Sequence, residues 1–122
     1  MPDKLMIIMV NTDPKNGAAV GAPFFQATVA AAMDYTVEIV MTGRAGELAK
    51  KGVAENLFIQ EGNPKTVYDF IKEAHDAGVT FKVCTPTLEL WGDDLIPEID
   101  ETIGAAYVIS EAMSNDTVTF TY

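Results

Sequence analysis

The 122-residue chain has few of the residues on which many active sites depend. It contains one cysteine, Cys84, and one histidine, His75. A single cysteine can neither form an internal disulfide nor give a zinc site two thiolate ligands. One histidine is too few for a histidine-based metal site, and a Ser-His-Asp triad would depend on His75 alone. The composition therefore indicates no metal site.

Basic residues are also scarce, with 8 Lys and Arg against 18 Asp and Glu and a formal net charge of -10. Such a chain repels nucleic-acid phosphates and anionic membranes, so we expect it to bind neither directly. No apolar run approaches the ~20 residues of a membrane-spanning helix, and residues 1–11 lack a signal-peptide cleavage site. We expect a cytoplasmic protein with a single domain over residues 1–122.

Short apolar runs alternate along the chain with segments that favour helices. The predicted strands cover residues 5–10, 36–41, 79–84, 99–103 and 117–122. The predicted helices cover residues 24–33, 65–77 and 104–114, with a short helix and loop over 44–57. Asn16-Gly17 and Gly21-Ala22-Pro23 predict a loop before the first helix. The alternation predicts a three-layer α/β/α fold around a mostly parallel sheet of about five strands.

Cys84 stands at the end of the third predicted strand, where α/β sheets collect their ligands and reactive groups. Asn11 follows the first strand and could border the same site, although turn formation alone explains it. Thr85 and Pro86 predict a helix start with Thr85 as its cap. Free N–H groups of that turn would stabilise a thiolate, and the Thr87 hydroxyl could donate a hydrogen bond to the sulfur.

Structural roles explain several of these residues equally well. A free cysteine is often a buried space-filler. Trp91 could form a contact surface beside Cys84, but a place in the core or at a subunit interface suits it better. We predict a surface ion pair for Arg44 and a solvated helix position for His75. A Cys-x-x-Cys pair is absent because Thr87 occupies the fourth position.

The order of these segments resembles the DsrE/DsrF-like family, which includes the TusD type of sulfur-relay subunit. The resemblance rests on five segments: Asn11-Thr12-Asp13-Pro14 after the first strand, the Ala-rich helix over 24–33, Val40-Met41-Thr42-Gly43, Val83-Cys84, and the tail from Asp94-Leu95-Ile96-Pro97 through Gly104-Ala105-Ala106 to Val118-Thr119-Phe120. It covers nearly the whole chain.

The resemblance implies a flavodoxin-like fold assembled as a homotrimer, a homohexamer or a related hetero-oligomer. It also implies a sulfurtransferase-like carrier in which Cys84 receives sulfane sulfur as a persulfide from a donor protein and passes it to an acceptor thiol, without a cofactor. Two other functions stay open from the residues: a non-catalytic assembly subunit with a structural cysteine, and a small flavin- or nucleotide-binding domain. A one-cysteine peroxidase is less favoured, since the Thr-x-x-Cys order is missing.

Overall fold

The computed structural model describes residues 2–122 of the chain. Its strands are β1 (Lys4–Met9), β2 (Thr36–Met41), β3 (Thr80–Cys84), β4 (Ile99–Ile103) and β5 (Thr117–Thr121). Its α-helices are α1 (Gly17–Ala32), α2 (Val67–Asp76), α3 (Thr85–Trp91) and α4 (Ala105–Ala112), with 3₁₀ helices η1 (Gly43–Ala49) and η2 (Ala54–Asn56). Within residues 2–122, no helix has the length and apolar character needed to cross a membrane.

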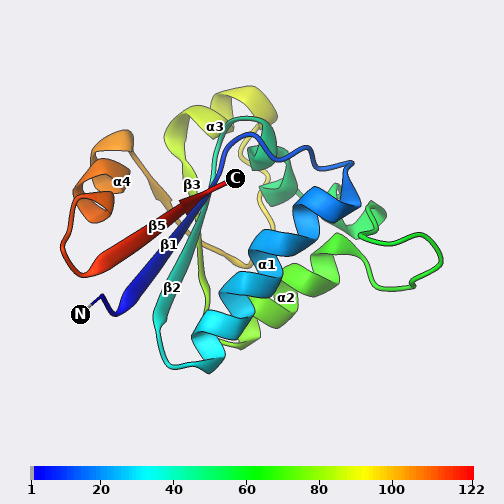
Figure 1. Cartoon of the computed structure of the whole chain (residues 1–122). Helices are drawn as coiled ribbons and strands as arrows, with labels where there is room; N and C mark the ends of the chain where they lie inside the picture. Colours follow the sequence, from blue (N-terminus) through cyan, green and yellow to red (C-terminus); the bar gives the residue numbers. More distant parts are fainter. Residues whose placement is uncertain (1) are drawn as a thin grey trace.

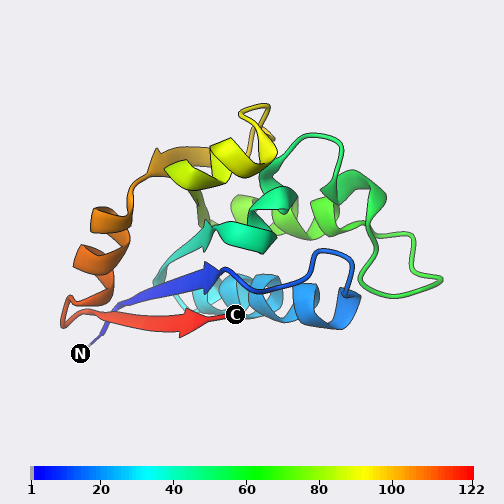
Figure 2. The same cartoon turned by 90° about the horizontal axis from the view of Figure 1, so that it is seen from above.

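The five strands form one sheet in the order β4-β3-β2-β1-β5, and every neighbouring pair is parallel. Helices α1 and α2 cover one face and α4 lies on the other (Figures 1 and 2). The α/β architecture with five strands predicted from the sequence is confirmed. Parallel strands share one carboxyl edge, and η1 and α3 both begin there, after β2 and β3.

The face under α1 and α2 holds the larger apolar core. Side chains alternate along a strand, so every second residue of β1, β2 and β3 points into this core. Helix α1 contributes Val20, Pro23, Phe24 and Ala27, which fall on one stripe because Pro23 and Phe24 lie three and four residues from both Val20 and Ala27. Cover on this side is extensive over β1, β2 and β3, and it ends at β5, where Val118 and Phe120 are each 41% exposed.

The opposite face has a smaller cluster of four buried residues, Met6, Val40, Cys84 and Ile103. Helix α4 packs on this cluster through partly buried side chains, and none of its own residues is fully buried. The cysteine thus lies on the face of the sheet that has the thinner cover.

Helix α1 begins at Gly17, so the loop predicted over Gly21-Ala22-Pro23 is wrong. Asn16 caps the helix by accepting a hydrogen bond from the Ala19 N–H at 3.3 Å. A Cβ atom on Gly17 would lie 2.0 Å from the carbonyl oxygen of Ile59. Gly17 and Gly21 let the helix pack closely against Ile59 in a distant loop. In the sequence, glycines needed for close packing look the same as glycines that mark a turn, and this explains the wrong prediction.

We predict that Gly17→Ala lowers the free energy of unfolding by about 1–3 kcal/mol, because the new methyl group meets rigid backbone at Ile59. Gly21→Ala is the matched control in the same helix. Its Cβ would meet only the Ile59 side chain, at 3.2 Å, and it gains helix propensity of up to about 1 kcal/mol. Urea unfolding of both variants measures the difference, and equal stability of Gly17→Ala and wild type would contradict this packing.

Candidate functional site

Cys84 is the last residue of β3 and the N-cap residue of α3. Its backbone is still extended, with φ -75° and ψ 142°, and the helix begins at the next residue. Only 8% of the residue is exposed, and its neighbours Met6, Val40 and Ile103 are apolar. The predicted position at the carboxyl edge of the sheet is confirmed, in surroundings that are largely closed.

Thr85 does not cap α3 as predicted, because the extended Cys84 takes that place and Thr85 becomes the first helical residue. The Thr85 hydroxyl instead donates a hydrogen bond to the carbonyl oxygen of Ile103 at 3.0 Å. Ile103 is also the residue that pairs with Cys84 across β3 and β4. Thr85 therefore joins the start of α3 to the end of β4 and fixes the backbone beside the cysteine.

Thr87 is almost completely buried, and its hydroxyl has no hydrogen-bond partner among residues 2–122. The predicted hydrogen bond to the Cys84 sulfur is therefore not formed. The methyl group of Thr87 packs against Gly46 in η1, where a Cβ atom would lie 2.1 Å from it. Packing of α3 on η1 is the role that the structure gives to Thr87.

Trp91 ends α3, and its indole N–H donates a hydrogen bond to the Gly43 carbonyl oxygen at 2.8 Å. This bond ties α3 to the start of η1. Asn11 is exposed after β1, where its backbone N–H binds the Tyr122 carbonyl oxygen at 2.9 Å. Strand β2 separates β1 from β3, so Asn11 and Cys84 follow strands that are not neighbours.

Two predictions about surface charges are supported. The Arg44 guanidinium lies 3.4 Å from an Asp13 carboxylate oxygen, and both side chains are more than 40% exposed, so the surface ion pair is confirmed. His75 is partly exposed on α2, with Nε2 3.0 Å from an Asp100 carboxylate oxygen. Its partner is thus an acidic residue of β4.

The sequence reasoning missed a buried group of charges on the Cys84 face of the sheet. The Lys82 ammonium lies 3.1 Å from a Glu38 carboxylate oxygen and 2.5 Å from the Tyr107 hydroxyl. That hydroxyl also binds both Glu38 oxygens, at 3.0 and 3.1 Å. The three groups connect β2, β3 and α4. We call Lys4, Glu38, Lys82, Tyr107 and Glu111 the polar cluster.

Lys4 completes the polar cluster, 3.3 Å from Glu38 and hydrogen-bonded to Glu111 of α4. Burial alone would lower the pKa of Lys82, but the hydrogen bonds with Tyr107 and Glu38 outweigh it and raise the pKa above its usual value. The pKa of Lys4 is raised in the same way by Glu111 and Glu38. Both lysines are therefore held in their charged form.

One signal in the sequence could have revealed the polar cluster. Glu38 and Lys82 are the charged residues within two segments that otherwise read as buried strands. Lys82 precedes Cys84 by two residues and therefore points to the same face of the sheet. Tyr107, which binds Lys82, also packs on the apolar cluster that contains Cys84. The polar cluster is thus a direct neighbour of the site.

Two hollows in the described part of the chain are lined by residues other than Cys84. One is an apolar groove of about 530 Å³ between α1 and β5. The other lies beside the segment from Asn56 to Asn63. Within residues 2–122, no group of three or more His, Cys, Asp or Glu side chains could hold a metal ion. The chemistry that this site offers is that of a single thiol.

Comparison with known proteins matches residues 4–120 to a model of the DsrE/DsrF-like family. The fold is similar to that of the ychN protein from E. coli, with a TM-score of 0.75, 12% identity and coverage of 100% of both chains. It is also similar to BT1422, a conserved protein of unknown function from Bacteroides thetaiotaomicron, with a TM-score of 0.69, 15% identity and coverage of 98% of this chain and 95% of that one. No curated protein matches the chain.

We predict that Lys82→Met lowers the free energy of unfolding by about 2–3 kcal/mol near neutral pH, because it removes a partner of the buried Glu38 carboxylate. The raised pKa of Lys82 implies a stabilisation that is complete below the usual value of 10.5 and is lost as pH rises through the folded-state value. Wild-type stability should therefore fall above about pH 10.5, and less steeply in the variant.

Lys72→Met is the control, because Lys72 forms a half-exposed ion pair with Asp69. Its loss should lower the free energy of unfolding by less than about 1 kcal/mol. Urea unfolding across the alkaline range measures both effects. Equal costs for Lys72→Met and Lys82→Met would show that the polar cluster contributes no more than a surface pair.

Proposed function

The chain belongs to the DsrE/DsrF-like family, and we propose that it is a sulfur-relay carrier of the TusD type. In this proposal Cys84 accepts sulfane sulfur as a persulfide from a donor protein and passes it to a thiol of an acceptor protein. The carrier acts in the cytoplasm as a homo-oligomer, a trimer or a hexamer. The transfer itself needs no cofactor.

The observation that carries the proposal is the placement of Cys84, the one cysteine of the chain, at the carboxyl end of β3 and at the start of α3. In α/β sheets this edge is where reactive groups gather. Thr85 holds the local backbone through Ile103, and Trp91 holds the far end of α3 through Gly43. The thiol is therefore presented from a turn that is fixed on both sides.

The proposed chemistry is a thiolate exchange without net oxidation or reduction. The Cys84 thiolate attacks the outer sulfur of the donor persulfide, and a new sulfur–sulfur bond forms as the bond to the donor cysteine breaks. The donor leaves as a thiolate, and the Cys84 thiol proton goes to water. In the second half an acceptor thiolate attacks the outer sulfur on Cys84, which is released as a thiolate.

Access to the sulfur depends on α4. Cys84 is 8% exposed, and α4 packs over its cluster through the partly buried Tyr107 and Val108. Moving α4 far would uncover this apolar cluster and separate the Tyr107 hydroxyl from Lys82 and Glu38, so only a limited motion is compatible with the fold. A small displacement of α4 is the motion we expect when a partner thiol approaches Cys84.

A second candidate function is favoured by the same burial. A thiol covered by Met6, Val40 and Ile103 could be a space-filling residue in a non-catalytic assembly subunit. The two functions differ in one property, the reactivity of the thiol in the native protein.

We predict that native protein incubated with polysulfide gains the mass of one or more sulfur atoms, and that reductant removes the gain. Cys84→Ser should fold normally and gain none, because the chain has no other cysteine. Intact-mass spectrometry, followed by peptide mapping to Cys84, measures the result.

Two outcomes would contradict the proposal. Sulfur loading of Cys84→Ser would show that the gain occurs elsewhere. No loading of wild type, together with a thiol that iodoacetamide labels only after unfolding in urea, would support the structural cysteine instead. The unfolded wild-type protein is the control for labelling, since its thiol is fully accessible.

A further inference from the structure

Helix α1 is apolar on two sides. None of its residues from Gly17 to Ala32 is charged. Besides the stripe buried in the core, it presents Phe25 and Val29, followed four residues later by Met33 at its C-cap, with 69%, 42% and 61% of their surface exposed. An apolar helix of this kind normally has cover on both sides. Within residues 2–122, this second stripe has none.

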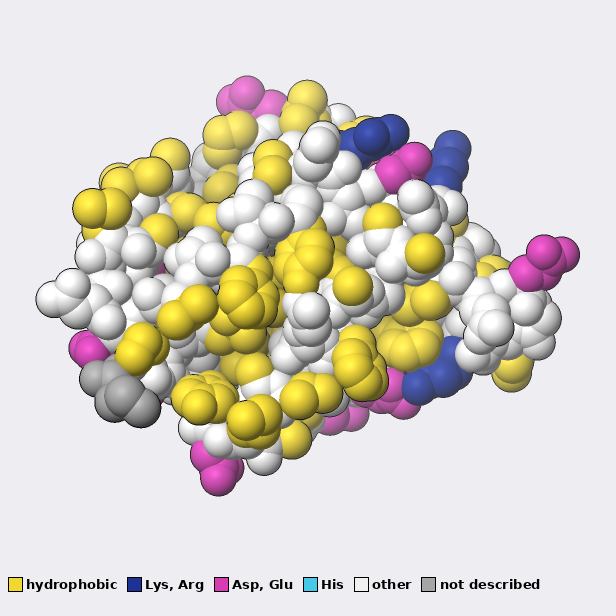
Figure 3. Space-filling model, viewed as in Figure 1, with side chains coloured by type: hydrophobic (Ala, Val, Ile, Leu, Met, Phe, Trp, Pro, Cys, Tyr) yellow, Lys and Arg dark blue, Asp and Glu magenta, His cyan; other side chains and the backbone are white. Residues whose placement is uncertain are grey.

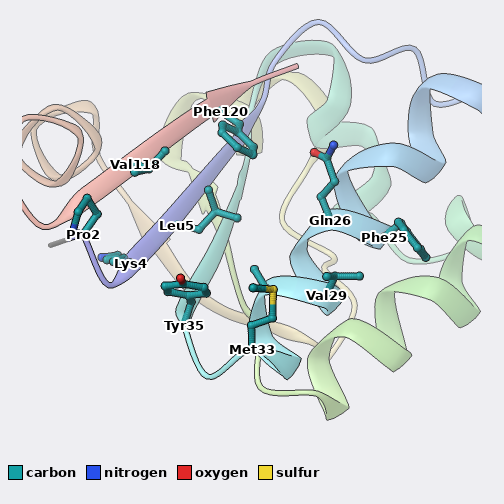
Figure 4. A pocket seen from close by; sticks show the side chains of 11 residues that line it. Pro2, Lys4, Leu5, Phe25, Gln26, Val29, Met33, Tyr35, Val118 and Phe120 are labelled. Atoms are coloured by element: carbon teal, nitrogen blue, oxygen red, sulfur yellow. The ribbon is translucent and has the colours of Figure 1, made fainter.

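The uncovered stripe faces an edge of the sheet. Strand β5 pairs with β1 and lies last in the strand order, so its other side has no neighbouring strand among the described residues. Val118 and Phe120 of β5 are each 41% exposed and line the apolar groove together with α1 (Figure 4). Hydrophobic side chains gather across this face, and acidic ones lie at its margin (Figure 3). Lys4 is the charged residue in the described lining.

The two edges of the sheet differ sharply. Strand β4, at the other edge, carries exposed Asp100 and Glu101, and its pairing with β3 contains a register shift. Charges and bulges of this kind keep foreign strands away from an edge. Strand β5 reads Thr-Val-Thr-Phe-Thr, without charge, proline or glycine. The fold thus protects one edge and leaves the other open to pairing.

We propose that a second copy of this chain docks on the β5 edge, with the two β5 strands antiparallel about a twofold axis at Thr119. This register places Val118 of each copy opposite Phe120 of the other, and Thr119 opposite Thr119. Aromatic with β-branched pairs and Thr–Thr pairs are both favourable across antiparallel strands. A twofold contact needs one self-complementary patch, and this strand provides one.

The size and charge of the patch fit this occupant. The exposed apolar side chains of α1 and β5 beside the groove offer roughly 600 Å² per copy, close to the ~800 Å² per partner of stable interfaces. Two chains with a net charge of -10 each repel one another, so a stable contact requires a surface free of acidic residues. Lys4, the charged residue in the groove lining, has its ammonium paired with Glu38 and Glu111, so its charge is balanced within the same copy.

This contact is independent of the sulfur chemistry, because β2 and β1 lie between β5 and the strand of Cys84. It does restrict the assembly: a twofold contact gives an even number of copies, which fits a hexamer and excludes a lone trimer. The two proposals can therefore be tested separately: Cys84 can fail to accept sulfur in a protein that still associates through β5, and the reverse result can also occur.

The experiment uses sedimentation velocity of the full chain with reductant present. Val118→Lys and Phe120→Glu should each halve the mass of the assembly, with the dissociation constant raised at least roughly 30-fold. An equal mixture of the two variants should restore it, because the introduced lysine then faces the introduced glutamate and the second Val–Phe pair is intact. Higher salt should strengthen the wild-type contact by screening the net charge.

Phe58→Glu is the matched control, an exposed apolar residue outside the groove, and its assembly should equal that of wild type. Circular dichroism checks that each variant is folded. If a β5 variant unfolds, Phe25→Glu on the outer stripe of α1 takes its place and should also halve the mass. A monomeric wild type, an odd-numbered assembly, or an assembly unchanged by the folded variants would overturn the proposal.

Discussion

The constraint on which this structure depends is that a parallel sheet must be covered on both faces. The chain has enough apolar helix to bury a large core on one face only, and even there the groove beside β5 stays open. Helices α1 and α2 close their face with a continuous core, whereas the other face receives the eight-residue α4, which has no buried residue. The polar cluster beside Cys84 follows from this unequal cover.

Charges replace apolar packing where the cover is thin. Lys82 and Glu38 project from central strands, and the Tyr107 hydroxyl of α4 joins them. A buried ion pair contributes little net stability, because desolvation offsets much of the attraction. In this structure the ion pair fixes the position of α4, because the Tyr107 hydroxyl of that helix is hydrogen-bonded to both Lys82 and Glu38. Cys84 lies beside that point, under a helix fixed by polar contacts and not by a large apolar core.

Local patterns were sufficient to predict most of the fold. Apolar runs gave the central strands, and Cys84 was expected at the end of β3, where it lies. The start of α1 could not be predicted, because the need for Gly17 arises from Ile59, which is far away in the sequence. The cap of α3 and the role of Thr87 were wrong for a similar reason: each depends on the contacts that β4 and η1 make with α3. In all three cases, the start of α1, the cap of α3 and the role of Thr87, the outcome depends on contacts with residues that are distant in the sequence.

The two incompletely covered surfaces lie on opposite faces of the sheet and have different chemistry. The groove beside α1 and β5 is apolar and has almost no charge, which suits a permanent partner that excludes water. The face under α4 is held by hydrogen bonds and ion pairs between largely buried polar groups. The proposed association through β5 would leave α4 and the charged β4 edge free. The proposed carrier needs this division, since its thiol would meet two partners in turn while the proposed assembly stays intact.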